Sequence, residues 1–204
     1  MKVVIIGAGT TAVMAAEILL ADPNISLTGF VGTEKEAVER KDTLVFGGLP
    51  FLGSRDVLPA LRKNSEVSGF VSAIGDNAVR ESAFYDGQRA GLESINVISR
   101  NASVSRFATL GDGIIIGHGV VVGAGATVGR NCIIESGTVI EVDAVVEDNC
   151  YLGPGVTFCG GRIGRNCHIG AGTTIGPYVN VGRNQTFSFG EVIRESVKDN
   201  PRTT

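Results

Sequence analysis

The 204-residue sequence has little of several features that would define a class of function. It has two histidines, which cannot supply the three histidine ligands of a zinc hydratase centre, and no metal is expected. It has no apolar run of about 18 residues, so no membrane insertion is expected. Its formal net charge of −3 gives no basic surface for nucleic acid. With 43% hydrophobic residues, the composition predicts a globular protein with a substantial core.

Cysteine is also scarce, and three of the four cysteines recur at nearly equal spacing. Cys132 and Cys150 lie eighteen residues apart, and Cys167 follows after seventeen. No other metal-ligating residues converge on them, so we expect a column of small, buried, unpaired thiols. The start, MKVVIIGAG, lacks the apolar core of a cleavable signal peptide. Reduced thiols without a leader predict a cytoplasmic location.

The second half of the chain has an apolar residue at every sixth position. The repeat fits neither a helix, with a period of 3.6, nor an alternating strand, with a period of 2. It fits a solenoid with three flat faces, in which each hexapeptide is one strand and one corner. Gly, Asp or Asn at the corners tolerates unusual backbone angles. The first eleven repeat positions are Ile98, Val104, Leu110, Ile116, Val122, Val128, Ile134, Ile140, Val146, Leu152 and Phe158.

One residue is missing from this rhythm. After Phe158 the next inward position is Ile163, five residues on, and the period of six then resumes as far as Phe187. A tighter corner is therefore expected around Cys159-Gly160-Gly161. The repeat predicts about five coils in a solenoid domain at 96–187, followed by a tail at 188–204 in which the pattern dissolves.

The first 95 residues predict a separate α/β domain. A strand at 2–6, the glycine turn Gly7-Ala8-Gly9, a helix at 10–21 and a strand at 25–31 form a βαβ half-Rossmann unit. Backbone N–H groups at such a helix start favour phosphate, which makes Gly7, Gly9 and Thr10 candidate ligands. An NAD site would need an acid where Gly32-Thr33 ends the second strand. The diphosphate of a nucleotide-sugar and a purely structural turn both remain open.

A second turn is expected beside the first. Residues 46–53 are assigned to a loop and 54–63 to a short helix that Pro59 weakens. A strand at 67–74 then leads to Gly75-Asp76-Asn77, with Asp76 as the cap of a helix reaching about Tyr85. Ligands bind at the carboxyl ends of parallel strands, so these three residues are candidates for substrate binding. The alternative is a helix cap and nothing more.

Several stretches together carry a resemblance to a known family. They are Gly7-Ala8-Gly9, the loop at 49–54, the stretch 73–77 with Arg80, and the hexapeptide run. With these, nearly the whole chain resembles the sugar acyltransferases related to sialic acid O-acetyltransferase and the bacillosamine- and perosamine-type N-acetyltransferases. The resemblance implies that the solenoid is a left-handed parallel β-helix and that the protein is a homotrimer. It also implies a nucleotide-sugar in the N-terminal domain and acetyl-CoA between neighbouring β-helices.

The chain departs from this family at functional positions. The family's base is a histidine in a Val-Ile-x-His-(Glu/Asp) stretch, which here ends Glu141-Val142-Asp143. Val142 cannot accept a proton. A second family histidine matches Tyr151, which we keep as a substrate-binding candidate. The family's C-terminal Gly-x-Pro-Ala-Lys strand and its acids after the second strand have no counterpart. These departures suggest altered chemistry, an altered acceptor or lost activity.

Other residues could still support acyl transfer, which needs a base and a donor to the oxyanion. His168 occupies the slot that Tyr151 has one coil below, and it is the leading base candidate. Asp143 borders the lost position and is a second candidate. His118, at a corner, is a third, and an exposed histidine without function is the alternative. Gly160 or Gly161 matches the family region whose backbone N–H meets the thioester, so both are candidates for holding the coenzyme.

Two functions follow. The first is an acyl-CoA-dependent O- or N-acyltransferase, with acetyl-CoA as co-substrate, that acts on a nucleotide-linked amino- or hydroxy-sugar in surface glycan biosynthesis. The second is a degenerate homotrimer that binds a nucleotide-sugar or acts as a scaffold without acyl transfer. Apolar residues expected to face outward, namely Ile115, Val121 and Ile133, favour association into a trimer.

Overall fold

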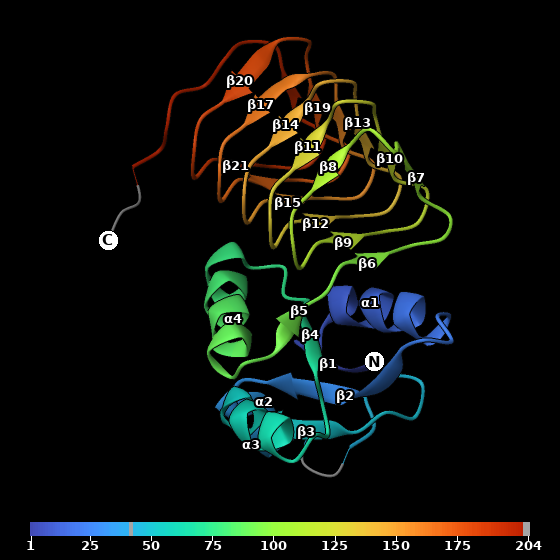
Figure 1. Cartoon of the computed structure of the whole chain (residues 1–204). Helices are drawn as coiled ribbons and strands as arrows, with labels where there is room; N and C mark the ends of the chain where they lie inside the picture. Colours follow the sequence, from blue (N-terminus) through green and yellow to red (C-terminus); the bar gives the residue numbers. More distant parts are fainter. Residues whose placement is uncertain (41–42, 202–204) are drawn as a thin grey trace. The chain divides into compact units, whose positions relative to one another are not determined.

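The computed structural model describes residues 1–40 and 43–201, so residues 202–204 of the expected tail lie outside the described part (Figure 1). Two compact units account for the chain, Met1–Val97 and Ile98–Thr204. Among the described residues, no helix combines the length and apolar character that crossing a membrane requires.

The first unit is an α/β domain built on a parallel sheet in the order β3-β2-β1-β4-β5. The central strand β1 is flanked by β2 and β4. The chain adds β2 and β3 on one side of β1 and then β4 and β5 on the other side. The strands are β1 (Lys2–Ile6), β2 (Ser26–Gly32), β3 (Phe51–Ser54), β4 (Gly69–Ser72) and β5 (Glu93–Ser94). The helices are α1 (Thr10–Leu20), α2 (Glu34–Glu39), η1 (Arg55–Val57), α3 (Leu58–Lys63) and α4 (Asn77–Arg89).

Burial explains the strands of this sheet. Val3 to Ile6 are fully buried although consecutive side chains point to opposite faces, as expected for a parallel strand covered on both sides.

The expected loop at 46–53 was partly wrong, because its end belongs to β3. Pro59 did not weaken the helix, because it lies in the first turn of α3, where a missing N–H breaks no helical hydrogen bond. Helix α2 and strand β5 were not anticipated.

The second unit is a left-handed parallel β-helix, which confirms the interpretation of the six-residue period (Figure 1). Its two-residue and three-residue strands stack into three parallel sheets. The first sheet contains β6 (Val97–Ile98), β9 (Ile115–Ile116), β12 (Ile133–Ile134), β15 (Tyr151–Leu152), β18 (His168–Ile169) and β21 (Thr186–Phe187). The second contains β7 (Ser103–Val104), β10 (Val121–Val122), β13 (Val139–Ile140), β16 (Thr157–Phe158), β19 (Thr174–Ile175) and β22 (Val192–Ile193). The third contains β8 (Thr109–Leu110), β11 (Thr127–Val128), β14 (Val145–Val146), β17 (Gly161–Ile163) and β20 (Val179–Val181).

The missing residue falls where the sequence placed it. Strand β16 ends at Phe158 and β17 begins at Gly161, so this corner holds only Cys159 and Gly160. Both glycines have positive φ, 115° at Gly160 and 100° at Gly161. The shortened corner lets β17 pair with β14 in the same register as the other coils, with Ile163 beside Val146.

The corner between the third and first sheets holds two regular columns. Its asparagines all have φ near +60°, and each amide donates to the next one toward the C-terminus, from Asn131 to Asn149 and on to Asn166 and Asn184. Next to them lie the cysteines, and Cys132, Cys150 and Cys167 form no disulfide and are fully buried. The expected column of buried thiols is confirmed, and burial raises the pKa of the Cys150 thiol.

Two expectations for this unit were wrong. The pattern does not dissolve after Phe187, because Val192–Ile193 forms β22 and pairs with β19. Ile193 lies six residues after Phe187, so the period continues one step further than expected, and Ile175 and Ile193 extend the inward stack. Ile115 and Ile133 are fully buried, so they cannot form an exposed apolar patch.

Candidate functional site

The two glycine turns lie at adjacent strand ends in the first unit. Strands β1 and β4 pair side by side, with Ile6 opposite Ser72. At Gly7, φ is +124°, and a Cβ there would lie 2.5 Å from the carbonyl oxygen of Ala73. Gly7 is therefore required by the close approach of the two turns, which the sequence reading had placed beside each other.

Gly9 and Gly75 differ from Gly7. A Cβ built at either position would meet no atom of the described residues within 4 Å, so packing among those residues does not require glycine. Thr10, the first residue of α1, is exposed. The open space beside Gly9 and Gly75 leaves room for a ligand to approach the backbone closely, which is the use of glycine in phosphate-binding turns.

The Gly75 turn is held from beneath by a buried arginine. Arg80 is fully buried, and its guanidinium donates to the carbonyl of Ile74 at 2.9 Å, to that of Gly75 at 3.2 Å and to Asn77 Oδ1 at 2.7 Å. Asp76 caps α4 by accepting from the backbone N–H of Val79 at 2.9 Å, as expected. The turn is therefore rigid before any ligand arrives.

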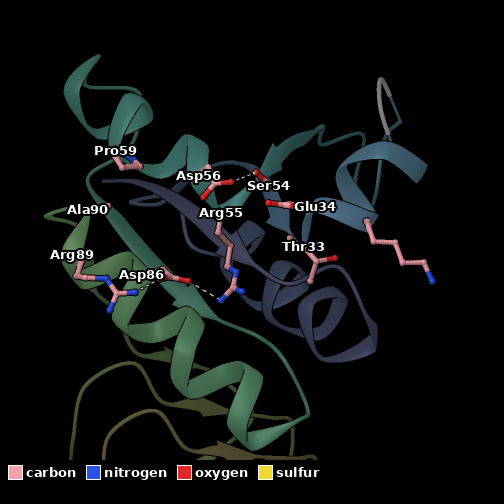
Figure 2. Close-up of a pocket in the computed structure, with 11 residues that line it drawn as sticks. Thr33, Glu34, Ser54, Arg55, Asp56, Pro59, Asp86, Arg89 and Ala90 are labelled. Atoms are coloured by element: carbon pink, nitrogen blue, oxygen red, sulfur yellow. Dashed lines mark hydrogen bonds and ion pairs between the residues drawn. The ribbon is translucent and has the colours of Figure 1, made fainter.

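A pocket of about 560 Å³ opens where β2 and β3 end (Figure 2). It begins next to the first glycine turn, because Gly32 lines the pocket and its neighbour Val31 accepts a hydrogen bond from Gly7 N–H at 2.8 Å. The other lining residues are Thr33, Glu34, Lys35, Ser54, Arg55, Asp56, Pro59, Asp86, Arg89 and Ala90.

A carboxylate between two arginines is the main polar feature of this pocket. Asp86 Oδ2 lies 2.7 Å from Arg55 Nη1, and Asp86 Oδ1 pairs with Arg89 (Figure 2). Asp56 is held by Ser54 Oγ, which donates to it at 3.1 Å. Sequence reasoning missed these residues, because they come from η1 and from the last turns of α4. The signals were Gly32-Thr33, which was noted for the acid it lacks, and the loop at 49–54, which ends at Ser54.

In the β-helix, the structure stacks the two residues that the sequence placed on one face. The rings of Tyr151 and His168 lie parallel, with centroids 4.6 Å apart and planes inclined by 10°. Both side chains are half-buried on the first sheet. The hydroxyl of Tyr151 donates to Glu135 Oε1 at 3.4 Å. The stacking fixes the plane of the His168 imidazole.

The other β-helix candidates lie elsewhere on the coil. Val142 and Asp143 form the corner between the second and third sheets, and both are exposed. Gly160 and Gly161 lie at the same corner one coil higher, because β14 and β17 pair. In a three-sheet prism this edge is opposite the first sheet. A single β-helix therefore does not bring His168 together with Asp143 or the two glycines.

His118 lies at a corner between the first and second sheets, and its Nδ1 is 2.7 Å from Ser99 Oγ. Ser99 is buried and His118 is half-buried. This contact gives His118 a structural partner in the first coils. Within the described residues, no group of three or more His, Cys, Asp or Glu side chains is placed to hold a metal ion.

The shortened corner offers a matched pair of substitutions. Gly161→Ala is expected to destabilise the protein by about 1–3 kcal/mol, because φ is +100° and the new Cβ would press into the carbonyl oxygen of Val179. Gly160→Ala has the same kind of backbone strain, but its Cβ would meet no described atom within 4 Å. Urea unfolding should therefore rank Gly161→Ala as the less stable variant. Equal midpoints would contradict the packing at this corner.

Comparison with family models divides the chain in the same way as the structure. Residues 2–86 match the PglD N-terminal domain, and residues 107–141 and 143–177 match the bacterial transferase hexapeptide repeats. No curated protein matches the sequence.

Solved structures resemble nearly the whole chain. A histidine-to-asparagine variant of perosamine N-acetyltransferase from Caulobacter crescentus, in complex with CoA and GDP-perosamine, is 28% identical, with a TM-score of 0.90 over 98% of this chain and 91% of that one. The acetyltransferase domain of PglB from Neisseria gonorrhoeae, in complex with acetyl coenzyme A, is 26% identical, with a TM-score of 0.85 over 97% and 93%. WeeI from Acinetobacter baumannii, at 20% identity and a TM-score of 0.84 over 98% and 95%, shows the fold alone.

Proposed function

Because this chain joins a PglD-type N-terminal domain to bacterial transferase hexapeptide repeats, we propose that it moves the acetyl group of acetyl-CoA to an amino group on a nucleotide-linked sugar. The observation that carries this proposal is the likeness, over 98% of the chain, to perosamine N-acetyltransferase held with CoA and GDP-perosamine. The open turns at Gly9 and Gly75 support it, since they leave backbone N–H groups accessible to a diphosphate.

The reaction needs a neutral amine, a base and a donor to the oxyanion. The amine nitrogen attacks the thioester carbonyl carbon, the nitrogen loses a proton, and the C–S bond breaks to release CoA as a thiol. We assign His168, whose ring plane is fixed by Tyr151, to take this proton and pass it to the leaving CoA sulfur. A backbone N–H at Gly160 or Gly161 is proposed to stabilise the oxyanion, as the family resemblance implies.

We propose that the active unit is a homotrimer, because one β-helix holds these groups on a face and on the opposite edge. Two neighbouring chains can bring the His168 face of one against the Gly160 edge of the other. Exposed apolar side chains line the second sheet and its edge toward the third, and such patches mark interfaces. They are Phe107, Val121, Val142, Tyr178 and Val192, with Tyr178 90% exposed. Sedimentation equilibrium should give three times the chain mass, and a monomer would contradict the shared site.

The test of function is release of CoA thiol from acetyl-CoA in the presence of nucleotide-linked amino-sugars. We expect one or more of them to be acetylated, with stoichiometric thiol release and a mass gain of one acetyl group. The alternative is a binding or scaffold protein, and Val142 favours it because an aliphatic side chain stands at the family's base position. Tight nucleotide-sugar binding without thiol release from any acceptor would support this alternative and overturn the transferase.

Replacing the proposed base is expected to slow catalysis. His168→Asn should lower kcat by about 10²-fold or more, because asparagine cannot accept the proton, while nucleotide-sugar binding is unchanged. The rate of the wild-type protein should also decrease when the pH is lowered below the pKa of a histidine. The variant should not show this decrease. The comparison variant is His118→Asn, which changes the other histidine. A loss in His118→Asn and none in His168→Asn would reverse the assignment.

A further inference from the structure

We propose that the pocket at the ends of β2 and β3 binds the nucleobase of the sugar nucleotide and prefers guanine, a proposal that rests on the proposed function. The pocket adjoins the glycine turn through Gly32 and Val31. A diphosphate at the turn would therefore have its nucleoside within reach of the pocket. The volume of about 560 Å³ lies within the range of small-molecule sites.

The charges of the pocket argue for a base and against a phosphate. Its lining carries three cationic and three anionic side chains, so their formal charges cancel. The cationic residues are Lys35, Arg55 and Arg89, and the anionic ones are Glu34, Asp56 and Asp86. A phosphate would meet as many negative as positive groups. A nucleobase, which is neutral and alternates donors with acceptors, matches such a lining. Pro59 and Ala90 add apolar surface for a ring.

Asp86 supplies fixed acceptors within this lining. Its carboxylate is oriented by Arg55 at 2.7 Å and by Arg89, and Arg55 Nη1 also donates to Ser82 Oγ at 3.4 Å. Two oxygens offer about four lone-pair sites, so two remain for a ligand after both arginines are bound. Figure 2 shows Arg55 and Arg89 reaching Asp86 from two sides, with Thr33 and Glu34 across from this group.

Guanine fits this arrangement better than the other bases. It presents two adjacent donors, N1–H and the N2 amino group, which match the two oxygens of one carboxylate. Its O6 and N7 accept from arginine, the commonest specific contact to this base. Uracil and thymine have one imide N–H between two carbonyl oxygens, which would face the carboxylate unfavourably. Adenine has no N1–H. Arg89 is largely exposed and can stack its planar guanidinium on the ring.

Isothermal titration calorimetry on the full chain tests the preference with GDP, IDP, UDP and ADP. We expect GDP to bind at least about tenfold more tightly than UDP or ADP, the discrimination that a bidentate base contact gives. IDP lacks only the N2 amino group of guanine, so it should bind more weakly than GDP. This comparison uses the unmodified protein and does not depend on any variant folding.

Asp86→Asn tests the residue itself. It should weaken GDP about tenfold or more and leave UDP nearly unchanged. The matched control is Asp148→Asn in the β-helix, which also removes one carboxylate from an arginine pair, at 3.1 Å from Arg130, and should change no nucleotide affinity. Thermal unfolding reports whether each variant keeps its stability.

The outcomes separate this inference from the function it rests on. Binding of UDP or ADP more tightly than GDP, equal affinity for GDP and IDP, or an equal loss for all nucleotides in Asp86→Asn would overturn the guanine preference and leave the transferase standing. Failure of every nucleotide to bind, including the diphosphate-sugars, would overturn the proposed function itself.

Discussion

Substituting histidine for Val142 is expected to raise the rate of acetyl transfer by about 10²-fold, and by up to about 10⁴-fold if base assistance limits the native chain. The new imidazole would stand where the family resemblance places the general base. The fold should accept it, because Val142 is 56% exposed at a corner and His118 already occupies the same slot of a hexapeptide at a different corner. The measurement is kcat for CoA release with the best acceptor.

The pH dependence gives this variant a second signature. An introduced histidine acts as a base only when neutral, so the gain should be present above its pKa of about 6.5 and should vanish as the pH falls below it. The matched control is Val142→Gln, which adds a polar side chain without a proton acceptor of useful pKa. Equal rates in the two variants would show that position 142 is not a vacant base position in this protein.

Phe158→Ala is expected to lower the free energy of unfolding of the β-helix by about 3–5 kcal/mol. Phe158 is fully buried, and its register neighbours Ile140 and Ile175 are also fully buried in the same apolar cluster. Truncation would open a cavity inside the prism, where the rigid stack of coils above and below cannot collapse to fill it. Urea unfolding followed by far-ultraviolet circular dichroism measures the change.

Phe189→Ala provides the control, since this phenylalanine is 81% exposed at a corner. Its truncation should change the free energy of unfolding by about 0.5 kcal/mol or less, as is usual for surface sites. The contrast isolates burial, because the chemical change is the same in both variants. A loss of similar size in the two would mean that Phe158 does not lie in the core.

The β-helix was predictable because a few neighbouring residues determine whether each side chain lies inside the coil or at a corner. The inward aliphatic and the corner Gly or Asn repeat in every coil, and even the missing residue before Gly161 appeared as a break in the count. Strand β22 was missed although Ile193 keeps the six-residue spacing from Phe187, because two charged residues, Glu191 and Arg194, flank it. Its pairing with β19, Ile175 opposite Ile193, follows the same eighteen-residue register as the regular coils.

The candidate site was predictable only in part, for a physical reason. Gly7, Gly9 and the Gly75 turn can be recognised in the sequence, because glycine follows the end of a predicted strand. Asp86 and Arg55 cannot be recognised in this way, because they meet only when η1 and α4 lie side by side. In the sequence, a charged residue on a helix is normally interpreted as a solvated surface residue. The pairing of distant helices depends on the packing of the whole domain.

The asparagine column sets the lengths that this protein can adopt during evolution. Each amide in the run from Asn131 to Asn184 must meet the next, and the last one ends on the carbonyl of Asn200. An inserted residue would move every later asparagine out of line with the one before it. The addition or removal of a full coil would leave each asparagine opposite another. Duplication and loss of whole coils are therefore the changes of length that this architecture accepts. Single deletions are confined to corners where glycine can adopt the backbone angles that a shorter turn needs.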